Sequence, residues 1–171
     1  MDWGDLVKTV LAAGVGSALV QIVMPLYLGR RQREDHAAYM AMRLAVILEA
    51  FARSCSDFIE ANRNAYHQED QEFPDWDATL PKLGSYPEDS DGWRAIDRNL
   101  AGRCLGLRNK IAESQGLISS VIEYSEDELG DTLDEHAAKR GLEAWQLAVE
   151  LRKRSGVEEV EPDWDYADVL E

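Results

Sequence analysis

The chain has 171 residues and a formal net charge of −15, from 33 acidic and 18 basic side chains. An acidic balance of this size repels phosphate backbones, so we expect no nucleic-acid partner. The two cysteines are too few for a disulfide framework, and without a CxxC pair there is no cysteine-rich zinc site.

The first predicted element is an uncharged run of twenty-one residues from Thr9 to Gly29. As a helix rising about 1.5 Å per residue it is roughly 32 Å long, which is enough to cross a hydrocarbon core of about 30 Å. The residues before the run are acidic and no small-residue cleavage site precedes Gly29, so it does not resemble a cleaved signal peptide. We therefore predict a single membrane-spanning anchor within residues 1–29.

Basic residues beside the run set its predicted orientation. Lys8 precedes the run, whereas Arg30, Arg31 and Arg33 follow it. Because Lys and Arg beside a span favour the cytoplasmic side, the N-terminus is predicted outside and the remainder of the chain in the cytoplasm.

Small and weakly polar residues share one face of the predicted anchor. They are Gly14, Ser17, Ala18 and Gln21. Such a face lets membrane helices approach closely, so it is the candidate surface for self-association into a homo-oligomer. Small residues are also ordinary filler in a membrane span, and the sequence leaves both readings open.

Two long helices of similar length are predicted next, over 34–66 and 92–124. In both, apolar residues recur at intervals of three and four. The first pattern allows the helix to continue directly from the anchor. Ser90 or Asp91 is a suitable cap for the second helix, because a short side-chain oxygen there accepts a free backbone N–H. Residues 67–91 between them are predicted as a long loop, since their prolines and glycine break regular structure.

The simplest packing of these two helices is an antiparallel hairpin joined by the loop. It places Cys55 and Cys104 at nearly the same height, each on or beside an apolar stripe. In a cytoplasmic domain we expect both thiols to stay reduced.

The C-terminal part of the domain is also predicted to be helical. Ser125 to Glu128 match a capping box, which marks a helix start. Gly141 follows two basic residues and is typical of a helix end, yet the helical pattern resumes to Arg154. The sequence does not decide between one kinked helix and two. We therefore predict an all-α domain over 30–156, folded as a three- to four-helix bundle.

Acidic residues concentrate in two stretches. Residues 67–91 hold eight acidic side chains and one Lys, and residues 157–171 hold seven acidic side chains and no base. Each stretch has a net charge of −7, so together they carry almost all of the charge of the chain. The last stretch lacks a helical stripe and is predicted to be a disordered acidic tail. If the last helical segment runs away from the membrane, both stretches lie at the membrane-distal tip.

The tetrapeptide Pro-Asp-Trp-Asp occurs once in each acidic stretch, with Trp76 and Asp77 in the first copy and Trp164 and Asp165 in the second. An exposed Trp among carboxylates suits an apolar pocket on a basic protein partner. Alternatively each Trp covers the ends of the protein's own helices, or the repeat is a coincidence in an acidic chain.

The sequence carries no recognisable catalytic motif. It has no HExxH, GxSxG, P-loop, GxGxxG or di-iron Glu-x-x-His pattern, and we expect no cofactor and no metal. His36 and His136 are expected at the surface. The leading hypothesis is a non-enzymatic, single-span membrane protein that recruits or scaffolds a protein partner. The alternative is an oligomeric membrane protein, a pore or toxin-like effector, that assembles through its anchor.

Overall fold

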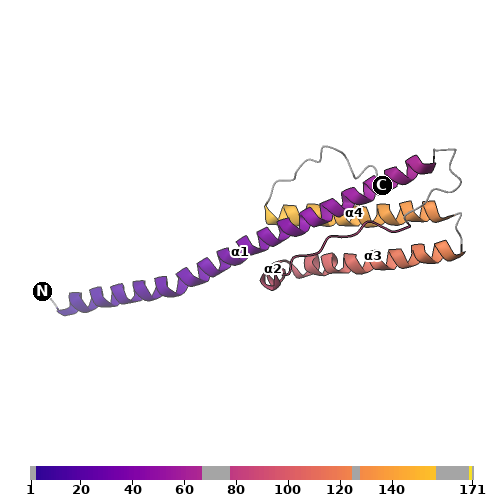
Figure 1. Cartoon of the computed structure of the whole chain (residues 1–171). Coiled ribbons are helices and arrows are strands. Elements are labelled where there is room, and N and C mark those ends of the chain that lie inside the picture. The colour runs from indigo at the N-terminus through magenta and orange to yellow at the C-terminus, as the bar shows by residue number, and fades with distance from the viewer. Residues whose placement is uncertain (1–2, 67–77, 125–127, 157–169, 171) are drawn as a thin grey trace. The chain divides into compact units, whose positions relative to one another are not determined.

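The computed structural model describes the backbone of residues 3–66, 78–124, 128–156 and 170. Side chains are described for residues 24–64, 78–124, 128–156 and 170. This described part contains four α-helices and no strand, which confirms the prediction of an all-α bundle (Figure 1). The helices are α1 (Trp3–Tyr66), α2 (Ser90–Ala95), α3 (Arg98–Tyr124) and α4 (Leu129–Ser155). The chain divides into an N-terminal unit, Met1–His36, and a bundle, Ala37–Glu171.

The contacts between α1 and α4 show that these helices are antiparallel. Near the start of the bundle, both oxygens of the Glu49 carboxylate accept hydrogen bonds from the Arg152 guanidinium, at the end of α4. Nearer the end of α1, Asn62 Nδ2 donates to Asp134 Oδ1 over 2.9 Å, at the start of α4. Residue numbers therefore rise along α1 as they fall along α4.

Helix α3 is antiparallel to α4 as well. Arg103 pairs with Glu150, and further along α3 Lys110 pairs with Glu143. Since α1 and α3 both run against α4, they run in the same direction as each other, as the bundle in Figure 1 shows. The predicted antiparallel hairpin of the first two long helices is therefore wrong, and the antiparallel neighbours of the bundle are α1 with α4 and α3 with α4.

The reason lies in the connection between α1 and α3. Residues 78–89 form no regular structure, yet they are bound along α3 by side chains of that helix. The segment and the short α2 after it also follow α1, because Gly84 of the segment faces Ile47 and Gly92 of α2 faces Met40. Residues 78–89 therefore run back along the length of the bundle, so that α3 starts at the end of the bundle where α1 enters it. The apolar side chains of this segment, which gain stability when they are covered by helices, favour this path.

The predicted helix over 92–124 is broken in two near Ile96. Asp97 begins the longer piece, α3, where its Oδ1 accepts from the backbone N–H groups of Asn99 and Leu100 over 3.0 and 3.2 Å. These hydrogen bonds to the carboxylate hold the pKa of Asp97 below its usual value. The short α2 is capped by Asp89, whose carboxylate accepts from the N–H of Gly92 over 2.9 Å. Neither Ser90 nor Asp91 is the cap.

Helix α4 is one continuous helix, which answers the question that the sequence left open. It ends at Gly156, whose φ of 67° is the left-handed conformation that glycine adopts at helix ends. Gly141 lies inside the helix and is not an end signal. A Cβ on Gly141 would lie 2.9 Å from Cys55 Cβ and 2.9 Å from a methyl group of Leu170. Glycine therefore fits the close approach of α1 and α4 at this position better than a residue with a Cβ.

The core lies between α1, α3 and α4, and both cysteines belong to it as free thiols. Burial raises the pKa of Cys55 to about 12 and that of Cys104 to about 11. Cys55 lies beside Gly141 of α4, whereas Arg103, which precedes Cys104 on α3, pairs with Glu150 of α4. Gly141 and Glu150 are about 13 Å apart along α4. The prediction that the two cysteines lie at the same height in the bundle is therefore wrong. The largest fully buried side chains are Met40, Leu44, Leu48, Ile59, Leu100, Leu107, Ile118, Leu133, Leu147 and Leu151.

Candidate functional site

The residues that the sequence singled out lie largely outside the described part. Both Pro-Asp-Trp-Asp copies, with Trp76, Asp77, Trp164 and Asp165, fall in segments that are not described. Gly14, Ser17, Ala18 and Gln21 lie within α1, but their side chains are not described. Among the described residues, none of the helices has the length and apolarity needed to cross a membrane.

The predicted acidic tail has one described residue, Leu170. Its side chain is only 3% exposed and its methyl groups lie over Gly141. Leu170 is therefore part of the core, beside the contact between Gly141 of α4 and Cys55 of α1.

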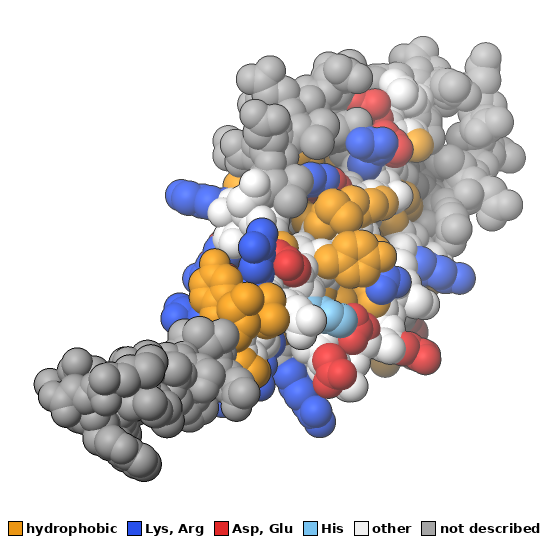
Figure 2. All heavy atoms as spheres, turned by 90° about the vertical axis from the view of Figure 1, so that its left-hand side faces the viewer, with side chains coloured by type: hydrophobic (Ala, Val, Ile, Leu, Met, Phe, Trp, Pro, Cys, Tyr) orange, Lys and Arg blue, Asp and Glu red, His pale blue; other side chains and the backbone are white. Residues whose placement is uncertain are grey.

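The described end of the predicted anchor is an apolar helix surface without protein cover. Met24, Leu26, Tyr27 and Leu28 are 56%, 69%, 61% and 48% exposed. At about 100° per residue these four side chains point to different sides of α1 and do not form one stripe. Figure 2 shows hydrophobic side chains next to the undescribed end of this helix. The exposed arginines that follow begin at Arg30, which pairs with Glu34 over 3.2 Å.

A serine–histidine contact between α3 and α4 was not anticipated from the sequence. His136 Nδ1 lies 3.1 Å from Ser114 Oγ, which also accepts a hydrogen bond of 2.9 Å from Arg140 Nε. His136 is partly buried, contrary to the expectation of a surface residue, and this burial lowers its pKa and favours the neutral imidazole. A neutral imidazole beside a hydroxyl is the arrangement of a nucleophile and its base. Ser114 is only 1% exposed, however, so its hydroxyl is shielded from solvent.

The other polar contacts between the helices are also structural. The hydrogen bonds that Arg152 donates to the Glu49 carboxylate raise the pKa of Arg152, and both side chains are largely buried. Burial raises the pKa of Asp134, although Asn62 and Arg63 both favour its charged form. Every buried polar side-chain atom of the described residues has a hydrogen-bond partner. These groups fix which helix faces pair, because a misplaced partner would leave a buried polar group unsatisfied.

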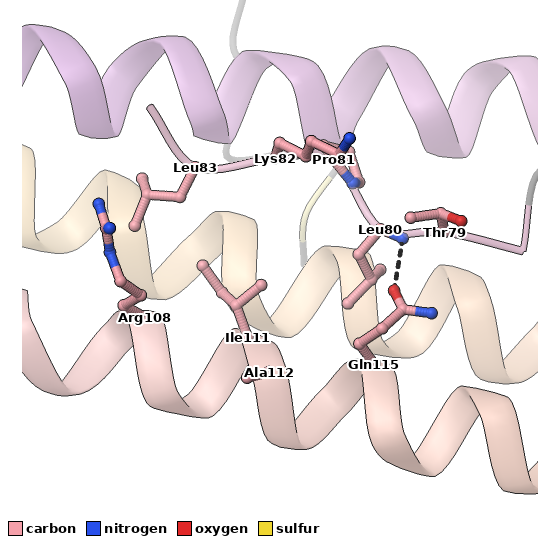
Figure 3. A pocket seen from close by; sticks show the side chains of 9 residues that line it. All are labelled: Thr79, Leu80, Pro81, Lys82, Leu83, Arg108, Ile111, Ala112 and Gln115. Carbon is pink, nitrogen blue, oxygen red and sulfur yellow. Dashed lines mark hydrogen bonds between the residues drawn. The ribbon is translucent and has the colours of Figure 1, made fainter. Parts of the chain in front are cut away.

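A cavity of about 340 Å³ lies between residues 79–83 and α3 (Figure 3). Gln115 stands at one end of it and Arg108 at the other, with Ile111 and Ala112 of α3 between them. Sequence reasoning missed this site, because residues about thirty positions apart line it and no motif joins them. The only signal was the apolar content of the predicted loop.

The chain matches no protein-family profile, no curated protein and no solved structure.

Proposed function

We propose that this protein is a membrane-anchored helical interaction protein, with a single span near Thr9 to Gly29 and a partner-binding bundle on the cytoplasmic side. The observation that carries the proposal is the bare apolar surface from Met24 to Leu28. A helix that carries apolar side chains on all sides is stable in lipid, whereas exposing those side chains to water is unfavourable. Arg30, Arg31 and Arg33 next to it suit the headgroups of a cytoplasmic leaflet and support the orientation.

A binding role is favoured over a catalytic one by two observations. The sequence carries none of the catalytic motifs, and the nucleophile-like pair of Ser114 with His136, among the described residues, is shielded from solvent at Ser114. The bundle also presents apolar side chains at its surface. Tyr39 and Val46 of α1 and Leu105 and Leu117 of α3 are each more than half exposed. Such residues supply contact area to a protein partner.

Membrane flotation and carbonate extraction of the full chain test the anchor. We expect the unmodified chain to remain with the membrane. Val15→Arg should lower the membrane-bound fraction, because an arginine near the centre of a span costs about 2.5–3.5 kcal/mol of insertion. Val46→Arg, on an exposed face of α1 in the bundle, is the matched control and should leave the fraction unchanged. An unmodified chain that is extracted completely by carbonate would contradict the proposal.

Cross-linking in native membranes, followed by mass spectrometry, tests the binding role. We expect cross-links from the bundle to a second kind of protein. If cross-links join only copies of this chain through residues 1–29, the oligomeric alternative is correct and the recruitment proposal is wrong.

A further inference from the structure

The cavity beside α3 is held open by a hydrogen-bonded contact at each end. At one end the Gln115 amide donates to the Ala78 carbonyl over 3.0 Å and accepts from the Leu80 N–H over 2.9 Å. At the other end Arg108 donates to the Gly84 carbonyl over 3.1 Å. Arg108 and Gln115 are seven residues apart, so the cavity is about 10 Å long.

The residues around the cavity have a charge opposite to that of the whole chain. Two of its nine lining residues, Lys82 and Arg108, are basic and none is acidic, although the chain holds 33 acidic residues in 171. The cavity therefore attracts a negative group that much of the protein surface repels.

Arg108 is placed to bind that negative group. Its guanidinium carbon lies 4.7 Å from the centre of the Tyr86 ring, within the range of a cation–π contact. A guanidinium has five N–H donors, and the one hydrogen bond to Gly84 leaves donors for a carboxylate. Figure 3 shows Arg108 at one end of the cavity, with the apolar side chains of Leu83, Ile111 and Leu80 following it toward Gln115.

We propose that this cavity binds a small organic carboxylate with an apolar aryl or alkyl body. The carboxylate pairs with Arg108, with Lys82 adding positive charge at the rim, and the apolar body lies over Ile111 and Ala112. A volume of about 340 Å³ holds a small molecule but not a folded peptide. The proposal is independent of the membrane anchor and of any protein partner.

Binding is measured by isothermal titration of phenylbutyrate into the full chain in lipid nanodiscs, with empty nanodiscs as the blank. The neutral analogue phenylbutyramide has the same body without the charge. We expect saturable binding of the carboxylate and at least about tenfold weaker binding of the amide, because a hydrogen bond to a charged group is lost. Equal binding of the two probes, or no saturable binding of the carboxylate, overturns the proposal.

Two variants locate the site. Ala112→Leu fills the cavity from an exposed position on α3 and retains both end contacts, so it should abolish binding in a folded protein. Ala50→Leu, at an exposed position on α1, is the matched control and should bind the carboxylate as the unmodified chain does. Arg108→Gln should weaken carboxylate binding more than amide binding, with folding checked by circular dichroism. Carboxylate binding that survives Ala112→Leu overturns the assignment to this cavity.

Discussion

Gly141 determines how closely α1 and α4 approach each other. Gly141→Ala adds a methyl group 2.9 Å from Cys55 Cβ, an atom fixed to the backbone of α1 that cannot rotate away. Overpacking of this kind costs about 1–3 kcal/mol, which exceeds the gain of about 1 kcal/mol from replacing a helical glycine by alanine. We expect a net loss of about 1 kcal/mol in the free energy of unfolding, measured by urea denaturation in detergent.

Gly102→Ala in α3 is the matched control, because nothing lies within 4 Å of the added methyl group. It should stabilise the protein by up to about 1 kcal/mol. If both substitutions stabilise the protein, the close packing of α1 on Gly141 is wrong.

His136 should make the stability of the bundle depend on pH. Burial lowers its pKa below the usual 6.5, so the folded state binds the proton less tightly than the unfolded state. Its contribution to stability is therefore complete above pH 6.5 and is lost as the pH falls through the folded pKa. We expect the midpoint temperature of thermal unfolding to decrease as the pH is lowered from about 7 to about 5. His136→Gln should reduce that slope, whereas the exposed His36→Gln should retain it; equal slopes in both variants would exclude His136 as the cause.

At the scale of elements, the extended segment over 78–89 packs in the bundle as the helices do. Leu80 is buried, and the Gln115 side chain pairs with its N–H and with the Ala78 carbonyl. Gln115→Ala removes both hydrogen bonds, and we expect the free energy of unfolding to fall by about 1–3 kcal/mol. Limited proteolysis should then cut within 78–89 faster than in the unmodified chain.

Glu113→Ala, on the exposed side of the same helix, is the control for this substitution. It should change stability by less than about 0.5 kcal/mol. Proteolysis of 78–89 at the same rate in both variants would show that Gln115 does not hold the segment.

At the scale of the whole molecule, the direction of the helices can be read by cross-linking. In a chain with both native cysteines replaced by alanine, Asn62→Cys and Asp134→Cys should react with one short bismaleimide, because these side chains touch. Asn62→Cys with Asn99→Cys should not. Asp97 pairs with Arg154, so Asn99 lies about twenty residues from Asp134 along α4, roughly 30 Å away.

The second pair is close only in an antiparallel hairpin of α1 and α3. Mass spectrometry of the digested products distinguishes the two pairs. A cross-link between the engineered cysteines at 62 and 99 would restore the hairpin and refute the parallel arrangement.

Local signals in the sequence determined most of the helical content. Apolar residues at intervals of three and four predicted a helix up to Tyr66, and α1 ends there. The helical pattern was predicted to reach Arg154, and α4 ends at Ser155. Such signals act over a few residues and need no partner. The same local reading failed at Gly141, because a glycine at a helix end and a glycine at a close helix contact are identical in sequence.

Tertiary packing alone decided which helices pair and in which direction. An apolar stripe on α1 is covered equally well by a parallel or an antiparallel neighbour, so periodicity cannot choose between them. The choice depended on the path of 78–89, whose contacts with Gln115 and Arg108 join residues far apart in the chain. The cavity beside α3 follows from that path. The uncharged run and its flanking arginines are properties of the sequence by itself, since the free energy of transfer to lipid depends on composition and length.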